Sequence, residues 1–188
     1  MKRSKRLFHS FILFLTPSAR KRTEYIRKHR LFGSVGKNCL IQNSKLPLYS
    51  NLIFLHDNVR IASNVGFITH DVIHHVLNNK YPDEKFAERM GCIEVMDNVF
   101  IGAGTRIMYD TRIGSNVIIG AGSLVTKDIP DNSVYAGVPA RRICSFDEYV
   151  EKQRDYTKEF ESRYGTVKPQ VDDKLAGMMR EKFLEDRK

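Results

Sequence analysis

Residues 93–125 read IEVMDNVFIGAGTRIMYDTRIGSNVIIGAGSLV, a stretch that repeats its character every six residues. An aliphatic residue recurs at that interval, and two positions before each of them stands a residue that is mostly small or β-branched. The aliphatic series is Val95, Ile101, Ile107, Ile113, Ile119 and Val125, and the preceding series is Ile93, Val99, Thr105, Thr111, Val117 and Ser123. The same phase continues upstream at Leu55, Ile61 and Phe67, with a fainter copy from Val35.

A period of six residues matches neither a helix, at 3.6, nor an alternating strand carried through a hairpin. It is typical of short strands separated by tight corners, stacked so that every coil adds a layer to one continuous core. The pairs Asp57-Asn58, Asp97-Asn98 and Ser115-Asn116 fall at equivalent corners, where a residue that tolerates positive φ is needed. The sequence therefore predicts an all-β solenoid of parallel coils.

Composition divides the chain into three parts. Residues 1–30 hold ten Lys or Arg against one acid, and this surplus of nine equals the formal net charge of +9 for all 188 residues. Residues 31–143 carry the repeat, interrupted at 69–92 by a segment without its phase, which we interpret as an extruded loop. Residues 144–188 are expected to form a helical C-terminal tail.

The basic segment contains a short apolar run, residues 7–15. It is too short to span a bilayer, which takes about 20 helical residues, and no signal-peptide cleavage site follows it. A basic helix with an apolar face can lie in a membrane interface, so residues 1–30 are a candidate for peripheral membrane contact. The alternative is that Leu7, Phe11 and Leu15 pack on the main body or on a partner subunit. No nucleic-acid recognition motif accompanies the charge, so no nucleic-acid partner is expected.

Helix-start signals mark both flanks of the repeat. Thr16 is expected to cap a helix that has Pro17 at its first position. Ser145 with Glu148 forms a capping-box pattern that predicts a charged helix, and residues 171–184 predict a last amphipathic helix.

The three cysteines, Cys39, Cys92 and Cys144, have no spacing typical of a zinc knuckle or of a disulfide framework. Buried, reduced thiols in a cytoplasmic protein are the simplest interpretation. The expected location is the cytoplasm, with the inner face of the membrane as a peripheral site.

The sharpest local signal is Phe67-Ile68-Thr69-His70-Asp71, where the coil ends and the extruded loop begins. A histidine at such a junction is held rigidly and still reaches solvent. A neutral imidazole is a common general base for removing a hydroxyl proton near neutral pH. Position alone does not separate this role from that of an ordinary polar loop histidine.

The second signal combines small residues with cations. Ala103 and Ala121 occupy equivalent corners 18 residues apart, where small side chains would let a thin ligand lie against the backbone. Thr126, Lys127 and Arg141 follow in Val-Thr-Lys-Asp and Gly-Val-Pro-Ala-Arg, and with Arg142 the cations could meet phosphates. The alternative for each lysine or arginine is a solvated edge.

On these motifs, residues 31–143 resemble the hexapeptide-repeat acyltransferases, above all the O-acetyltransferases of capsule and lipopolysaccharide clusters and those that act on maltose or galactosides. The resemblance implies a left-handed parallel β-helix, a homotrimer with active sites between subunits, and acetyl-CoA as co-substrate without a metal. It implies His70 as general base and Ala103, Ala121, Thr126, Lys127 and Arg141 at the CoA end. Tyr109-Asp110 replaces the frequent Pro-Gly corner, and Arg106 and Arg112 are unusual.

The expected acceptor is a sugar hydroxyl of a capsular or lipopolysaccharide precursor. A free sugar, a sugar amine or an antibiotic would use similar residues. Two readings outside acetyl transfer stay open. One is a γ-class carbonic anhydrase, because His70 and His75 have the spacing of two of its zinc ligands. The other is a scaffold that uses the solenoid as a binding surface.

Overall fold

The computed structural model describes residues 3–166 and 170–187, with backbone only at Arg3. Thirteen short strands form three sheets, and five α-helices and one 3₁₀ helix lie between and beyond them in the described chain. The helices are α1 (Arg3–Leu15), α2 (Ala19–Lys28), η1 (Ser50–Leu52), α3 (Ile73–Lys80), α4 (Phe146–Tyr164) and α5 (Asp173–Glu185). The strands are β1 (Ser34–Val35), β2 (Leu40–Ile41), β3 (Ile53–Leu55), β4 (Val59–Ile61), β5 (Gly66–Ile68), β6 (Ile93–Val95), β7 (Val99–Ile101), β8 (Arg106–Met108), β9 (Thr111–Ile113), β10 (Val117–Ile119), β11 (Leu124–Val125), β12 (Ser133–Ala136) and β13 (Arg141–Ser145).

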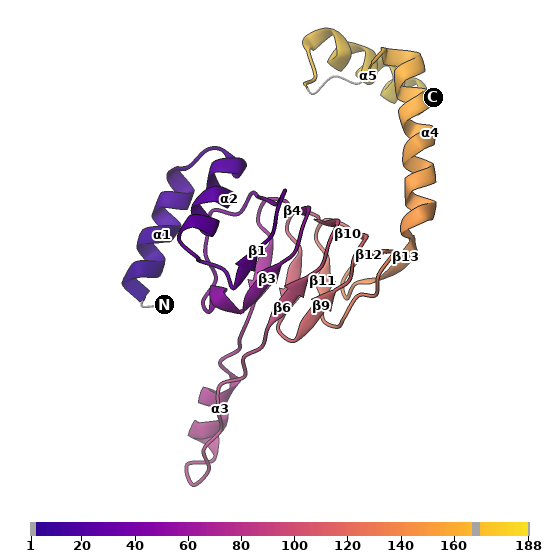
Figure 1. Cartoon of the computed structure of the whole chain (residues 1–188). Coiled ribbons are helices and arrows are strands. Elements are labelled where there is room, and N and C mark those ends of the chain that lie inside the picture. The colour runs from indigo at the N-terminus through magenta and orange to yellow at the C-terminus, as the bar shows by residue number, and fades with distance from the viewer. Residues whose placement is uncertain (1–2, 167–169, 188) are drawn as a thin grey trace. The chain divides into compact units, whose positions relative to one another are not determined.

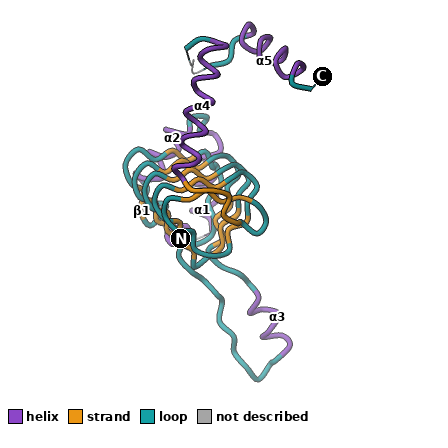
Figure 2. Tube along the Cα trace, turned by 90° about the vertical axis from the view of Figure 1, so that its right-hand side faces the viewer, coloured by secondary structure: helices purple, strands orange, loops and turns teal. Residues whose placement is uncertain are grey.

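From β3 to β11 the chain visits the three sheets in rotation. One sheet has the order β1-β3-β6-β9, the second β13-β12-β10-β7-β4-β2 and the third β11-β8-β5. Every pairing is parallel except that of β12 with β13. Val99 pairs with Val117, so one full turn takes 18 residues. Strands of successive coils superimpose when the stack is viewed from its end (Figure 2). The predicted parallel solenoid is confirmed in this respect.

The interior of the stack consists of the residues of the six-residue repeat. The aliphatic series from Val95 to Val125 is 0–1% exposed, and the preceding series from Ile93 to Ser123 is 0–3% exposed. Strands of two or three residues contribute little each, but stacking lets every coil bury its apolar face against the next. The prediction that these positions point inward is confirmed.

Asparagines turn one corner of each coil. Asn58, Asn98, Asn116 and Asn132 all have φ between 55° and 59°, a left-handed conformation that asparagine tolerates better than most residues. Their side-chain amides form a ladder, from Asn58 to Asn98 at 3.0 Å, on to Asn116 at 3.0 Å and to Asn132 at 2.8 Å. The expected corner role of Asn58, Asn98 and Asn116 is confirmed.

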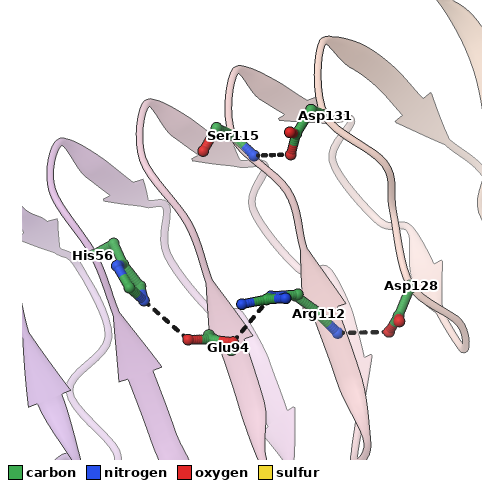
Figure 3. A network of polar contacts seen from close by, with 6 residues as sticks. All are labelled: His56, Glu94, Arg112, Ser115, Asp128 and Asp131. Carbon is green, nitrogen blue, oxygen red and sulfur yellow. Dashed lines mark hydrogen bonds and ion pairs between the residues drawn. The ribbon is translucent and has the colours of Figure 1, made fainter.

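Charged residues link the coils on the outer face of the first sheet (Figure 3). Glu94 accepts from His56 Nε2 at 3.0 Å and pairs with Arg112 Nε at 3.0 Å. The backbone N–H of Arg112 donates to Asp128 at 2.7 Å. Arg112, unusual in the sequence, is therefore one member of a polar row that runs across successive coils.

The interruption of the repeat forms a long protrusion from the coils, as predicted (Figure 1). It is not wholly irregular, because α3 occupies Ile73–Lys80. The sequence predicts a plain loop there, without a helix. The helix has no side-chain cap and buries none of its residues. Its sequence therefore shows neither of the usual helix signals, a capping residue or an apolar face that packs on the coils.

The N-terminal helices α1 and α2 lie beside the first coil (Figure 1). Leu13 and Ile26 are each 1% exposed and belong to the core. Leu7, Phe11 and Leu15 do not pack on the main body, because these side chains are 56–60% exposed, and their packing on a partner subunit stays a prediction.

The expected cap of the second helix is also wrong. Helix α2 begins at Ala19, and its N-cap is Ser18, whose hydroxyl accepts from the N–H of Lys21. The Thr16 hydroxyl instead donates to the carbonyl of Ile12 at 2.8 Å.

The contacts divide the chain into two compact units, residues 1–146 and 147–188. The second unit contains α5 and nearly all of α4, as the sequence suggested for residues 144–188. Asp172 caps α5 by accepting from the N–H of Leu175 at 2.8 Å. Among the described helices, none has the length and apolar character needed to cross a bilayer.

The three cysteines are free in the structure, but only Cys39 is buried. Cys92 is exposed and Cys144 is half-buried, so the expectation of three buried thiols is wrong for these two. Burial raises the pKa of the Cys39 thiol.

Candidate active site

His70 lies two residues beyond β5, where the chain leaves the third sheet for the protruding loop. Its backbone bridges to Met90 on the returning arm, so both arms of the loop meet at this histidine. The imidazole packs edge-on against Tyr49, with ring centroids 5.2 Å apart. Its Nδ1 is buried and has no hydrogen-bond partner among the described residues. The His70 side chain is thus half-buried, and its ring is held by packing against Tyr49.

Polar contacts fix the outgoing arm beside His70. The Tyr109 hydroxyl donates to Asp71 Oδ2 at 2.7 Å, and the N–H of Ile73 donates to Asp71 Oδ1 at 3.1 Å. These hydrogen bonds, that of Tyr109 first, lower the pKa of the Asp71 carboxyl, because they stabilise the carboxylate. The same contact raises the pKa of Tyr109. The guanidinium of Arg89 stacks over the Tyr109 ring, 5.1 Å from its centroid.

The returning arm is fastened to the first coil. The Tyr49 hydroxyl donates to Glu88 Oε2 at 3.0 Å, which raises the pKa of Tyr49. The buried Thr69 hydroxyl donates to the carbonyl of Leu48 at 2.6 Å, and the N–H of Gly91 donates to the carbonyl of Thr69 at 3.0 Å. The residues on either side of His70 are therefore tied both to the coils and to the opposite arm.

Thr126, Lys127 and Arg141 line one pocket of about 340 Å³. Arg142, Tyr135 and Asp128 also border it, so three cations face a single carboxylate. Thr126 and Lys127 directly follow β11, just as His70 follows β5 in the same sheet. Two strand spacings separate β5 from β11, which places this pocket about 10 Å along the stack from His70.

Ala103 and Ala121 lie at the opposite ends of the strands of the third sheet, at the corners before β8 and β11. Both are exposed, and the N–H of Gly122 donates to the carbonyl of Ala103 at 2.8 Å. They do not line the pocket at Lys127. The site residues predicted from the sequence therefore flank the two edges of one sheet, and only Thr126, Lys127 and Arg141 share a cavity.

Four residues beside His70 were missing from the sequence-based site. They are Tyr49, Glu88, Arg89 and Tyr109. Only Tyr109 gave a signal, as the departure from the usual Pro-Gly corner. Within residues 3–166 and 170–187, no three His, Cys, Asp or Glu side chains are grouped so that they could hold a metal ion.

Comparison with known proteins adds independent information. Residues 93–127 match the family model described as bacterial transferase hexapeptide (six repeats). The galactoside O-acetyltransferase of Lactococcus lactis is 34% identical over 58% of this chain and 61% of its own length. The galactoside O-acetyltransferase of Escherichia coli is 33% identical over 78% and 79%. Protein CapG of Staphylococcus aureus is 39% identical over 78% of this chain and 86% of its own length.

A solved structure of a galactoside acetyltransferase in complex with coenzyme A superimposes with a TM-score of 0.56 at 28% identity. The match covers 90% of this chain and 89% of that one. The family model covers part of the repeat, and two relatives of at least 33% identity cover 78% of the chain. The chain therefore belongs to the hexapeptide-repeat acetyltransferases.

Proposed function

We propose that this protein transfers an acetyl group from acetyl-CoA to a hydroxyl of a sugar, in a capsular or lipopolysaccharide precursor. The observation that carries the proposal is the placement of His70. Its half-buried imidazole is packed against Tyr49 at the mouth of the loop, on the same side of the third sheet as the cationic pocket at Lys127.

In the proposed reaction, the imidazole of His70 takes the proton of the acceptor hydroxyl as its oxygen attacks the thioester carbonyl. A backbone N–H stabilises the negative charge that develops on the carbonyl oxygen. The thiolate of CoA leaves, and the protonated His70 returns the proton to it. Holding both substrates in one cleft supplies much of the rate, since the reacting atoms are already oriented.

The donor is proposed to lie along the stack, with its phosphates at Lys127 and Arg141 and with Thr126 beside them. Guanidinium and ammonium groups form strong charge-assisted hydrogen bonds with phosphate. Ala103 and Ala121 lie at the opposite ends of the strands of the third sheet, so we propose that they leave the backbone open to the pantetheine arm of a donor held between this copy and its neighbour. The pocket at Lys127 lies about 10 Å along the stack from His70, on the same edge of the third sheet. This placement supports a donor that runs along the stack.

We further infer that the coils wind left-handed and that three copies assemble, with the loop of one reaching over its neighbour. Val72, Ile73 and Val76 on the loop are 56–67% exposed. Such an apolar face on a protrusion favours contact with a partner subunit.

The galactoside O-acetyltransferase relatives favour a free galactoside as the second candidate acceptor.

Helix α1 supports a peripheral membrane location at the inner face of the cytoplasmic membrane. Five large apolar side chains of this helix are 56–72% exposed: Leu7, Phe8, Phe11, Phe14 and Leu15. They lie in the most basic part of the chain. An anionic bilayer offers both apolar depth and opposite charge. Cosedimentation with anionic vesicles is expected for the wild type and not for a Phe11→Ser, Phe14→Ser double variant.

The donor site is tested by titrating acetyl-CoA into Lys127→Gln and Arg141→Gln variants. Each is expected to weaken binding by about tenfold, because each removes one charge-assisted contact. Lys152→Gln, an exposed lysine on α4, is the matched control and is expected to bind as the wild type does. Unchanged affinity in both pocket variants would remove the cationic pocket from the donor site.

A further inference from the structure

A second cavity, larger than the pocket at Lys127, is lined by none of the residues assigned above. It measures about 440 Å³ and lies between the segment that follows β2 and the starts of β5 and β8. Arg6 from α1, Lys45 from that segment and Arg106 from β8 all line it. None of the described residues that line it is acidic, so its three positive charges have no carboxylate facing them.

Arg106 is built into the wall of this cavity. Its Nη1 donates to the carbonyl of Asn64 at 2.8 Å and to that of Gly104 at 3.0 Å. It pairs in register with Gly66, where an added Cβ would lie 2.6 Å from Arg106 Cδ. Any side chain at Gly66 would push the arginine out of its place, so the strand pairing itself reserves space for the cation.

Arg6 enters the cavity from the N-terminal helix. Its Nη1 donates to the carbonyl of Leu46 at 3.3 Å. Its Nε is buried and has no hydrogen-bond partner among the described residues. The guanidinium of Arg6 thus keeps hydrogen-bonding capacity that no described residue uses, and an anionic ligand in the cavity would pair with its charge.

The cavity reaches the same sheet as His70, at the opposite end of the strand. Gly66 and Phe67 line it, and His70 follows Gly66 by four residues. Four extended residues span about 13 Å, more than a single sugar ring covers. A ligand that joins the two places must carry its anionic group beyond the sugar whose hydroxyl meets His70.

We propose that this cavity binds the diphosphate of a glycosyl diphosphate acceptor, with Arg6, Lys45 and Arg106 as its cationic contacts. A diphosphate matches three clustered cations better than the single charge of a uronic acid does. The assignment of an acceptor role rests on the proposed acetyl transfer, whereas binding of the diphosphate does not. Nucleoside-linked and lipid-linked sugars share this chemistry.

The test is calorimetric titration of inorganic pyrophosphate into the full chain, with CoA already present to occupy the pocket at Lys127. The wild type is expected to bind. Lys45→Gln and Arg6→Gln are each expected to weaken binding by about tenfold, since each removes one charge-assisted contact. Lys37→Gln, an exposed lysine outside the cavity, is the control for the loss of one charge. Absence of binding, or equal weakening in all three variants, would overturn the proposal.

Two further ligands distinguish the sources. UDP in solution and undecaprenyl diphosphate in vesicles are compared with pyrophosphate, and the one that binds more tightly identifies the carrier. If neither exceeds pyrophosphate, the cavity is not an acceptor site and the proposal fails. Acetyl-CoA binding is measured separately. Its absence would refute the proposed function while the pyrophosphate result still decides the cavity.

Discussion

The coils and the loop that protrudes from them are stabilised in different ways. In the coils, side chains such as Ile93, Ile101 and Ile119 are fully buried, and each strand pairs with a strand above or below it. In the loop, α3 buries no residue, and Val76 on it is 67% exposed. The loop is instead fastened at its base by Asp71 with Tyr109 and by Tyr49 with Glu88.

This difference separates stability from chemistry within one chain. The coils form a rigid frame, because each inward residue packs on the layers above and below it. His70 sits where that frame meets the polar contacts of the loop base. Changes in the coils should therefore act on unfolding, while changes at the loop base should act on turnover.

The largest effect is expected from a cavity in the coils. Ile101→Ala removes a side chain with 0% exposure from β7, in the middle of the six-stranded sheet. The free energy of unfolding should fall by about 2–5 kcal/mol. Urea unfolding followed by circular dichroism measures it. Val76→Ala on the exposed face of α3 is the matched change in the loop and should stay within about 0.5 kcal/mol of the wild type. Similar losses in both variants would break the comparison.

A smaller effect, on turnover alone, is expected at the loop base. Tyr109→Phe removes the hydrogen bond to Asp71 and keeps the ring under Arg89. The rate of acetyl transfer should fall by about two- to tenfold, because the arm that carries His70 loses one anchor. The urea midpoint should not move. Tyr81→Phe, at an exposed tyrosine of the same loop, is the control. Tyr109 has no positioning role if both variants keep the wild-type rate.

The smallest effect is a pH dependence of the same contact. The hydrogen bond from Tyr109 lowers the pKa of Asp71 in the folded protein. The stabilisation of the loop base by the Asp71 carboxylate is therefore complete above the unfolded pKa of about 3.9. It is lost as the pH falls through the lower pKa of the folded protein. The protection of the amides of residues 71–90 against hydrogen exchange, taken relative to their intrinsic rates at each pH, should persist near pH 4 and fall below it. In Asp71→Asn this acid step should vanish, and its persistence would assign it to another group.

The coils could be predicted from the sequence because their periodicity repeats the same local chemistry. Every sixth residue of the series from Val95 is buried as expected, and the asparagine corners have the expected positive φ. The pattern also located the interruption at 69–92 and the junction at His70. Such regular features depend on neighbours only one coil away.

The remaining features depend on contacts between segments far apart in the chain. Tyr49 meets His70 and Glu88 only after the coils have stacked and both arms of the loop have returned. Leu7 and Phe11 are exposed because α1 packs on the coils through Leu13, on its opposite side. Composition alone does not show which side of the helix packs. The cavity at Arg6 likewise joins residues 6, 45 and 106.

The most direct test of the proposed chemistry compares the wild type with His70→Ala, using acetyl-CoA titration and then release of free thiol with mixed oligosaccharides as acceptors. Both proteins should bind acetyl-CoA with similar affinity. Thiol release should fall by about 10²- to 10⁴-fold in the variant, since it lacks only the general base. The account would be contradicted if His70→Ala released thiol at the rate of the wild type, or if the wild type failed to bind acetyl-CoA.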